Sequence, residues 1–211
     1  VKINSIKAIG KNKDLDLFVL KFDNEKLMQE MELTITHFLK SYLEINDDEF
    51  VSEVRADLFN LTKEIESQKR CLVHRDYHSR NLMVQNEQIF VIDFQDARQG
   101  IPQYDLVSLI DDCYFMLDST MKTYLKKYYF NALNNSRDEK LDWVDFEYFY
   151  DLMKIQRTLK AIGSFCYIND TKKNNKYLKY VGYSFNNLRE TVLKQSKYSA
   201  LTKLVQIYYE K

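Results

Sequence analysis

Residues 71–100 read CLVHRDYHSRNLMVQNEQIFVIDFQDARQG, and this stretch decides the fold. It contains three short apolar runs, at 71–73, 82–84 and 89–92, each bounded by polar residues. Short runs rich in Val, Ile and Phe are typical of β-strands. The polar residues 85–88 between the last two runs indicate a turn, so those two runs predict a β-hairpin.

Residues that can carry chemistry flank the predicted hairpin. His74, Arg75 and Asp76 precede it, Asn81 follows Asp76 by five positions, and Asp93 comes directly after the last strand. A loop between two strands would hold Asp76 and Asn81, and the hairpin would return the chain so that Asp93 faces both. Phosphoryl transfer requires a carboxylate that accepts a hydroxyl proton, and a carboxylate with an amide oxygen that hold Mg²⁺.

The spacing is that of the H-R-D-x-x-x-x-N loop and the following metal-binding aspartate of protein-kinase-like enzymes. The alternative is a polar surface turn in which Asp76 and Asn81 merely cap a loop. That alternative leaves the position of Asp93 after the hairpin unexplained. We therefore interpret the stretch as a phosphoryl-transfer site.

Composition excludes several other classes of protein. The 211 residues include 31 Lys and Arg against 31 Asp and Glu, so no excess charge indicates a nucleic acid or an anionic membrane as partner. Aromatic residues make up 14% of the chain, which excludes intrinsic disorder. No apolar run approaches the roughly 18 residues of a membrane span. The odd number of cysteines, without a C-x-x-C pair, fits reduced thiols, so we expect a cytoplasmic protein.

Glycine and proline are scarce, with 4 and 1 residues, far below the usual share of about 7% and about 5%. This favours long helices over a turn-rich β-sandwich. Apolar residues recur at helical spacing on both sides of the central stretch. We therefore expect a predominantly helical α+β domain. The predicted helices are 24–42, one beginning near 48, 104–116, 119–133, 141–167, 173–195 and 199–209.

HRDYHSRN, followed by VIDFQDARQGIPQYDLVSLIDDCY, resembles the C-terminal lobe of the aminoglycoside-phosphotransferase-like small-molecule kinases. Two further segments, EMELTITHFLKSYL at 30–43 and IQRTLKAIGSFCYI at 155–168, are more similar to the bacterial anomeric kinases of N-acetylmuramate and N-acetylglucosamine, which act in cell-wall recycling. The resemblance covers roughly residues 25–195. It implies the C-terminal lobe of a protein-kinase-like fold, with the catalytic loop carried by a short β-hairpin.

The resemblance also implies roles for individual residues, with ATP as co-substrate and Mg²⁺ as cofactor. Asp76 would be the catalytic base, and Asn81 and Asp93 would bind the magnesium ion. The remaining residues would support the site: His74 and Arg75 brace the loop, His78 orients its backbone, Asp105 ties a helix to it, and Gln95 and Asp96 face the substrate. Asp105 can equally be an acidic residue favoured by the dipole of a helix N-terminus.

Arg157 and Lys160 lie one turn apart on a predicted helix. They could direct a basic edge at a sugar or phosphate, or simply form a solvated helix face. We keep them as candidate substrate residues beside the central site.

Elements that bind nucleotide in protein-kinase-like enzymes are not recognisable. Glycines occur only at positions 10, 100, 163 and 182, so no G-x-G-x-x-G loop exists. We expect residues 23–211 to form a C-terminal lobe and residues 1–22 to be a connector or a remnant of the linker to an N-terminal nucleotide lobe. That lobe would be the missing partner, alongside a small-molecule acceptor.

The function that these observations favour is ATP-dependent transfer of phosphate to a hydroxyl of an amino sugar, N-acetylmuramate or N-acetylglucosamine. An aminoglycoside, choline or homoserine kinase of the same fold is the alternative, and Asp111, Asp112 and Asp118 could give a polycationic acceptor an acidic cleft. A third alternative is a non-catalytic binding module derived from a truncated kinase. Tight nucleotide binding by the chain alone would contradict the expectation of a missing lobe.

Overall fold

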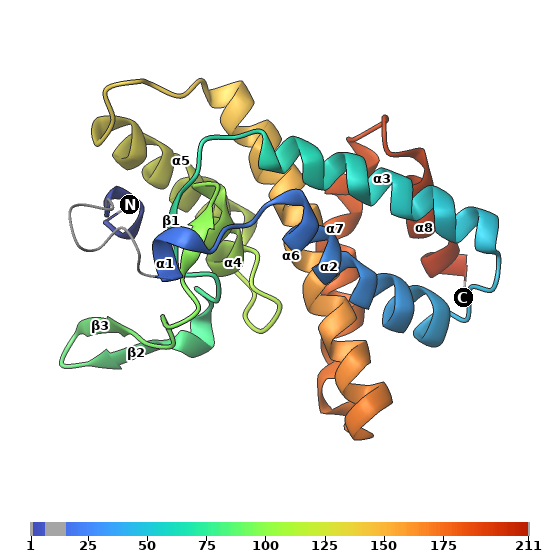
Figure 1. Cartoon of the computed structure of the whole chain (residues 1–211). Helices are drawn as coiled ribbons and strands as arrows, with labels where there is room; N and C mark the ends of the chain where they lie inside the picture. The colour runs from blue at the N-terminus through green and yellow to red at the C-terminus, as the bar shows by residue number, and fades with distance from the viewer. Residues whose placement is uncertain (1, 7–15, 211) are drawn as a thin grey trace. The chain divides into compact units, whose positions relative to one another are not determined.

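The computed structural model describes residues 2–6 and 16–210, which form two compact units (Figure 1). The first unit comprises the described residues up to Phe22 together with Ser67–Met153. The second comprises Asp23–Glu66 and Lys154–Lys211, of which residues up to 210 are described. The long helix α6 (Trp143–Lys172) contributes residues to both units.

The first unit contains two small antiparallel sheets and three longer helices. Strand β1 (Cys71–Val73) pairs with β4 (Arg98–Gly100), and β2 (Leu82–Gln85) pairs with β3 (Gln88–Val91). The helices are α4 (Gln103–Ile110), α5 (Ser119–Asn135) and the beginning of α6. Short helical segments complete the unit: η1 (Ile3–Ser5), α1 (Asp16–Val19) and η4 (Ser79–Asn81).

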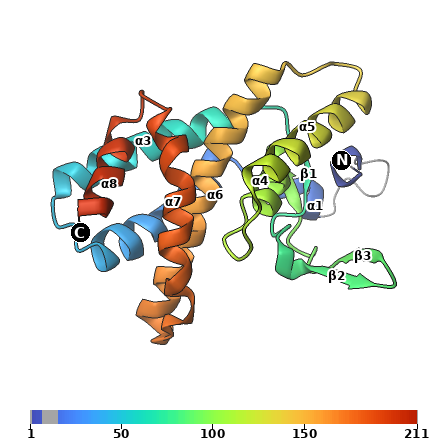
Figure 2. The same cartoon turned by 180° about the vertical axis from the view of Figure 1, so that it is seen from behind.

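The β2–β3 hairpin confirms the hairpin expected from the sequence. Its two-residue turn places Asn86 and Glu87 at φ angles of 49° and 61°, which is the left-handed geometry of a type I′ turn. This turn suits the twist of two antiparallel strands. The ribbon extends away from the rest of its unit in both views (Figures 1 and 2).

Strand β4 has no counterpart among the predicted elements. Its sequence, Arg-Gln-Gly, lacks the apolar and β-branched residues that signal a strand. It forms because its backbone pairs with the buried strand β1, with Leu72 opposite Gln99. A Cβ atom at Gly100 would lie 2.9 Å from Val73 Cγ2. Glycine therefore lets β4 approach β1 closely.

The core of the first unit centres on α4, in which every residue from 103 to 108 is buried. Phe22 stacks on Tyr104 with ring centroids 4.4 Å apart. A second aromatic group joins α5 to α6, where Trp143 meets Phe130 edge-on at 4.9 Å and stacks on Phe146 at 5.8 Å. Because α4 is buried in this packing, the groups that bind to its side chains are held in place as well.

The regular elements of the second unit, in its described residues, are all helices. It contains α2 (Asn24–Leu33), the π-helix η3 (Thr34–Tyr42), α3 (Asp48–Glu66), the later part of α6, η5 (Asn175–Tyr180), α7 (Val181–Leu193) and α8 (Ser199–Glu210). Asp23 caps α2 by accepting a hydrogen bond from the Lys26 backbone N–H at 3.0 Å. Helix α8 packs against α3 and α7.

Helix α6 approaches the helix formed by α2 and η3 very closely in the second unit. A Cβ atom at Gly163 would lie 2.7 Å from Thr34 Cα and 2.8 Å from Thr34 N. The Thr34 hydroxyl donates to the Leu159 carbonyl oxygen at 2.8 Å, and Gln156 Nε2 donates to Glu30 Oε2 at 3.0 Å. The two segments that most resemble the anomeric sugar kinases therefore pack against each other.

Apart from the π-helical second half of the helix expected over 24–42, the predicted helices differ from the structure chiefly at two places. The helix expected over 104–116 ends at Ile110, because residues 111–114 turn away and use the side chain of Asp112 in loop contacts. The helix expected over 173–195 is divided into η5 and α7. Among the described residues, no helix combines the length and the apolar content that crossing a membrane requires.

Candidate functional site

The loop between β1 and β2 begins with backbone groups held by a buried carboxylate. Asp105, in the first turn of α4, accepts hydrogen bonds from the backbone N–H of His74 at 2.7 Å and of Arg75 at 3.1 Å. Asp105 is buried and only 7% exposed. Arg75 takes a positive φ of 81°, which a non-glycine residue adopts only when its surroundings hold it there. These contacts direct the chain into Asp76.

Asn81 contacts the other two residues expected to form the site, Asp76 and Asp93. Its side-chain Nδ2 donates to the Asp76 carbonyl oxygen at 2.9 Å and lies 3.4 Å from Asp93 Oδ2. The backbone of Asn81 also accepts a hydrogen bond from the Ile92 N–H at 3.1 Å, which ties the loop to the base of the hairpin. The hairpin therefore returns Asp93 to Asn81, as the spacing predicts.

The residues after Asp93 contact the same group. Asp93 has a positive φ of 68°, and its Oδ1 accepts a hydrogen bond from Gln95 Nε2 at 2.6 Å. Arg75 Nη1 forms an ion pair with Asp96 Oδ2 at 2.6 Å, and Arg75 Nε lies 3.9 Å from Asp76 Oδ2. Gln95 and Asp96 thus lie beside the predicted metal and base residues. Asp93, Gln95 and Asp96 are all exposed, so the site is open to solvent.

The donors at this place suit a magnesium ion that also binds phosphate. In the part of the chain that the structure describes, no three His, Cys, Asp or Glu side chains gather into a metal cage. Asn81 contributes an amide oxygen and Asp93 a carboxylate. Mg²⁺ prefers such oxygen ligands, and it commonly takes one or two carboxylates while water and substrate phosphates complete its coordination. Asn81 and Asp93 therefore fit the ion that the sequence predicts.

The two histidines of the loop lie in different surroundings. His74 is 2% exposed and its ring meets Tyr77 edge-on at 5.7 Å. Among the described residues, neither of its ring nitrogens has a hydrogen-bond partner. Burial, followed by the charge of Asp105, raises the pKa of Tyr77 above its ordinary value. His78 meets the Tyr114 ring edge-on at 5.5 Å. Their bracing and orienting roles stay predictions.

Arg157 and Lys160 lie on the part of α6 that belongs to the second unit, whereas the loop belongs to the first. Both residues are half-buried. Their role at the acceptor stays a prediction that the geometry of the loop does not address.

The three aspartates that could have given an acceptor an acidic cleft do not form one. Asp111 and Asp112 are 6% and 3% exposed, and both use their carboxylates inside the first unit. Asp111 accepts from Lys122 Nζ at 2.8 Å and from the Tyr150 hydroxyl. Asp118 caps α5 by accepting from the Met121 N–H at 2.8 Å. The spacing of these aspartates in the sequence does not distinguish a buried carboxylate from one that lines a cleft.

Sequence reasoning also missed Asp112 and Tyr114 as neighbours of the loop. Asp112 accepts a hydrogen bond from the Ser79 backbone N–H at 2.8 Å, and Tyr114 lies against His78. Both residues fall within the stretch that resembles the kinase family, and an acidic residue followed by an aromatic residue just past α4 is the only signal they give.

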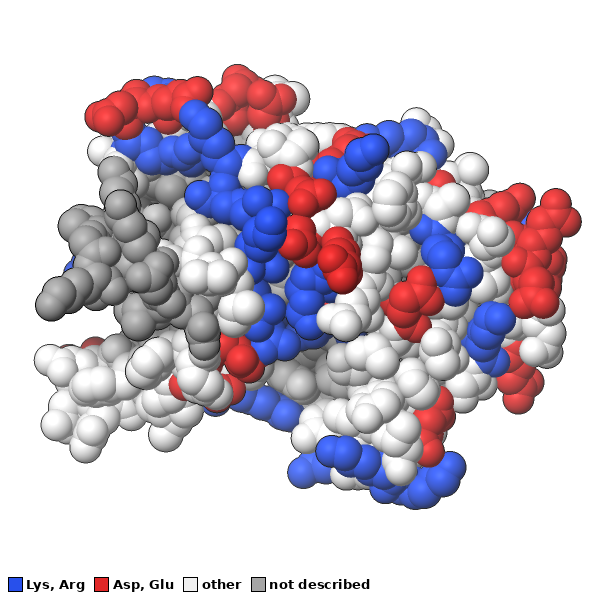
Figure 3. Space-filling view, in the orientation of Figure 1, with Lys and Arg blue, Asp and Glu red and all other residues white. Residues whose placement is uncertain are grey.

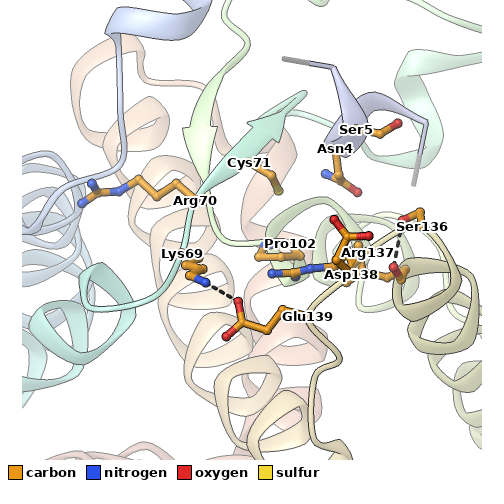
Figure 4. Close-up of a pocket in the computed structure, with 11 residues that line it drawn as sticks. Asn4, Ser5, Lys69, Arg70, Cys71, Pro102, Ser136, Arg137, Asp138 and Glu139 are labelled. Carbon is orange, nitrogen blue, oxygen red and sulfur yellow. Dashed lines mark hydrogen bonds and ion pairs between the residues drawn. The ribbon is translucent and has the colours of Figure 1, made fainter. Parts of the chain in front are cut away.

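A partly open cavity of about 340 Å³ lies elsewhere in the first unit (Figure 4). It opens at the start of β1 and is lined by Cys71, Lys69, Arg137 and Glu139 among others, and Lys69 is paired with Glu139. Burial, followed by the charge of Asp105, raises the pKa of Cys71 to about 12, so this thiol is not a nucleophile at neutral pH. None of the predicted catalytic residues lines this cavity.

The surface offers no strong field of one sign on the face drawn in Figure 3, where basic and acidic side chains are interspersed. The hairpin is largely uncharged and presents apolar side chains to solvent. Those exposed on it and directly after it are Met83, Val84, Ile89, Phe90, Ile92 and Phe94.

Comparison with known proteins identifies the family. The model of the phosphotransferase enzyme family matches residues 5–138, which include the loop, the hairpin and α4. The chain belongs to this family. The kinase resemblance of the sequence is thereby confirmed.

The curated relatives that match this chain are bacterial proteins named N-acetylmuramate/N-acetylglucosamine kinase. The chain is 29% identical over 186 residues to an N-acetylmuramate/N-acetylglucosamine kinase of Pseudomonas aeruginosa, covering 87% of the chain and 55% of that protein. It is 31% identical over 150 residues to the kinase of the same name from Neisseria meningitidis, covering 68% of the chain and 42% of that protein. The chain thus spans about half the length of the curated relatives it matches.

Solved structures support the expected fold of this chain. A gentamicin complex of the aminoglycoside phosphotransferase APH(2'')-IIa matches with a TM-score of 0.56 at 21% identity, covering 89% of the chain and 57% of that protein. The ADP-bound structure of APH(2'')-Ib matches with the same TM-score and identity, over 90% of the chain and 60% of that protein. These two matches confirm the expected helix-rich, protein-kinase-like fold.

Proposed function

We propose that this chain carries the metal-binding and acceptor-activating residues of an ATP-dependent kinase that phosphorylates an amino sugar. The observation that carries the proposal is the position of Asn81, whose amide lies between the Asp76 backbone and the Asp93 carboxylate. A surface turn that only caps itself has no need of an aspartate returned to it by a hairpin. Family membership supports phosphotransfer as the reaction class.

In the proposed mechanism Asp76 accepts the proton of the attacking sugar hydroxyl. Asn81 and Asp93 would hold Mg²⁺, which neutralises developing charge on the phosphate oxygens when it is bound. Arg75 places its guanidinium between Asp96 and Asp76 and so limits the directions in which the Asp76 carboxylate can turn. Asp105 fixes the loop from below by binding two of its backbone N–H groups.

N-acetylmuramate or N-acetylglucosamine is the acceptor we propose, with cell-wall recycling in the bacterial cytoplasm as its setting. The relatives of that name are 29% and 31% identical to this chain, whereas the aminoglycoside phosphotransferases are 21% identical to it. The burial of Asp111 and Asp112 also argues against the acidic cleft that those residues would have offered a polycationic acceptor.

We also propose that an N-terminal lobe supplies most of the nucleotide contacts. The 211 residues contain no glycine-rich phosphate loop, and the exposed apolar hairpin would lie at the boundary of a nucleotide site. Activity is therefore best measured on a protein that includes this lobe and has the length of the curated relatives.

The test compares Asp76→Asn with Asp138→Asn in the full-length protein. Both aspartates belong to the first unit, but Asp138 is exposed and lines the cavity near Cys71, away from the loop between β1 and β2. We expect Asp76→Asn to lower the turnover of N-acetylmuramate by about 10²- to 10⁴-fold, which is typical of a lost general base, and Asp138→Asn to leave it unchanged. Phosphorylation at the anomeric carbon is followed by ³¹P NMR.

A substrate panel completes the test. We expect transfer to N-acetylmuramate and N-acetylglucosamine and none to an aminoglycoside, choline or homoserine. Undiminished turnover in Asp76→Asn would refute the assignment of the base. Binding of Mg-ATP and sugar without any transfer by the wild-type protein would support a binding module instead.

A further inference from the structure

Residues 111–114, which directly follow α4, hold the second half of the loop between β1 and β2. Asp112 is 3% exposed and binds two backbone groups at once. Its Oδ2 accepts from the Ser79 N–H at 2.8 Å, and its Oδ1 accepts from the Tyr114 N–H at 2.7 Å. Charge-assisted hydrogen bonds of this length are short and strong. The carboxylate therefore bridges the loop and the end of α4.

Tyr114 adds two ring contacts to the same part of the loop. The His78 ring meets it edge-on with centroids 5.5 Å apart, and the guanidinium carbon of Arg80 lies 3.7 Å from its ring centroid. A guanidinium over an aromatic face at this distance is an attractive cation–π pair. Residues 78, 79 and 80 are thus each held by Asp112 or Tyr114, which we name the post-α4 clamp.

The post-α4 clamp acts on the segment that presents Asn81. Ser79 is the first residue of the short helix η4, and Asn81 is its last. Asp105 binds His74 and Arg75 at the beginning of the loop, five and four positions before Ser79. Two buried carboxylates carried by α4 and the segment after it therefore divide the loop between them, and the clamp serves the half that contains the predicted metal ligand.

We propose that Asp112 and Tyr114 are positioning residues that set the orientation of Asn81 for the metal ion. The inference rests on the proposed function, because it assigns Asn81 to Mg²⁺. Partners that orient a metal ligand from behind commonly change metal affinity by about 10- to 100-fold when they are replaced. The carboxylate of Asp112 binds the backbone N–H groups of Ser79 and Tyr114, so its effect on Asn81 passes through the backbone of residues 79–81.

Asp111 provides a matched control for Asp112. It precedes Asp112 in the chain, is similarly buried at 6% exposed, and binds Lys122 and the Tyr150 hydroxyl. None of these partners belongs to the loop. A general loss of stability will therefore follow from either substitution, whereas a change at Asn81 will follow only from Asp112.

The experiment compares Asp112→Asn with Asp111→Asn in the full-length protein. Mn²⁺, used in place of Mg²⁺, is titrated in the presence of ATP by electron paramagnetic resonance. We expect Asp112→Asn to weaken Mn²⁺ binding by about tenfold or more and Asp111→Asn to leave it within about twofold. Hydrogen exchange of the backbone amides of residues 78–81 should become faster in Asp112→Asn alone.

A second pair of variants tests the ring independently of the carboxylate. Tyr114→Phe keeps the ring over Arg80 and should bind Mn²⁺ as the wild type does, whereas Tyr114→Ala should weaken binding. Equal Mn²⁺ affinities and equal amide exchange in Asp112→Asn and Asp111→Asn would overturn the proposal. If the wild-type protein bound no Mn²⁺ and transferred no phosphate, the proposed function would fail. Amide exchange at 78–81 would then still decide whether the clamp holds the loop.

Discussion

The two units of this chain are stabilised at their critical points by different kinds of contact. In the first unit, buried carboxylates hold irregular backbone, as Asp105 does at His74 and Asp112 does at Ser79. In the second unit, helices approach until side chains no longer fit, as they do where Gly163 meets Thr34. Charge-assisted hydrogen bonds can fix a loop in one shape, whereas close packing fixes the spacing of helices. The predicted chemistry lies in the unit of the first kind.

The comparison predicts the largest loss of stability for Asp105→Ala. The substitution leaves two backbone N–H groups without their acceptor in a buried place, and each such group costs about 1–3 kcal/mol. We expect the first unit to lose at least about 2 kcal/mol of unfolding free energy. Trp143 is the single tryptophan and packs within this unit, so its fluorescence in a urea titration measures the effect.

Asp145 is the control for Asp105, because it is also an acidic residue in the first turn of a helix but is exposed. If Asp105 acted only on the helix dipole, Asp105→Ala and Asp145→Ala would each lower the free energy of unfolding by a similar amount, about 0.3–1 kcal/mol. A loss confined to that range in Asp105→Ala would contradict the role of Asp105 as the support of the loop.

Gly163→Ala should give the next largest effect, and it should appear in the second unit. The new Cβ would lie 2.5 Å from Thr34 Oγ1 and 2.7 Å from Thr34 Cα, and a backbone atom cannot move aside cheaply. Overpacking of this kind costs about 1–3 kcal/mol, more than the gain of roughly 1 kcal/mol in helix propensity. Urea unfolding followed by far-ultraviolet circular dichroism measures the difference.

Gly182→Ala sharpens the same test. In this second helical glycine the nearest atom to the new Cβ would be the Tyr208 hydroxyl oxygen at 3.4 Å, an ordinary contact. We therefore expect Gly182→Ala to be neutral or to stabilise the unit by up to about 1 kcal/mol. If Gly163→Ala stabilised the protein as much as Gly182→Ala did, close approach would not be what orders these helices.

The same contrast explains what the sequence could predict. The loop and the return of Asp93 follow from spacing within about thirty residues, because a hairpin imposes that geometry locally. The pairing of Glu30 with Gln156 joins residues 126 positions apart, and periodicity says only that each lies on a helix. Strand β4 was missed because its pairing with β1, not its own composition, makes it a strand. Long-range partners are decided by packing, which no local pattern contains.

The pH dependence of the second unit should reflect a pair between α6 and η3. Burial raises the pKa of Asp170, but hydrogen bonds from His37 and Ser41 outweigh it, so the pKa lies below its ordinary value. A lowered carboxyl pKa contributes stability above the unfolded value of about 3.9, and the contribution is lost as the pH falls through the folded pKa.

Asp170→Asn tests this dependence. We expect the variant to be slightly less stable than the wild type at pH 6 and to approach it at pH 3, as measured by thermal unfolding. Asp47→Asn, at a carboxylate that accepts from the Phe50 N–H near the start of α3, is the comparison for a general acid effect. A constant difference between wild type and Asp170→Asn across this range would contradict the assignment.

The smallest effect is expected at the tip of the hairpin, where Glu87 occupies the left-handed region with a φ of 61°. A side chain with a Cβ pays about 1–2 kcal/mol there, and glycine avoids this cost at the expense of about 0.5–1 kcal/mol of chain entropy. Glu87→Gly should therefore stabilise the hairpin by roughly 0.5 kcal/mol. The gain will appear as slower hydrogen exchange of the cross-strand amides of β2 and β3. Glu87→Ala removes the charge but keeps the Cβ, so an equal gain in that variant would assign the effect to charge instead of backbone geometry.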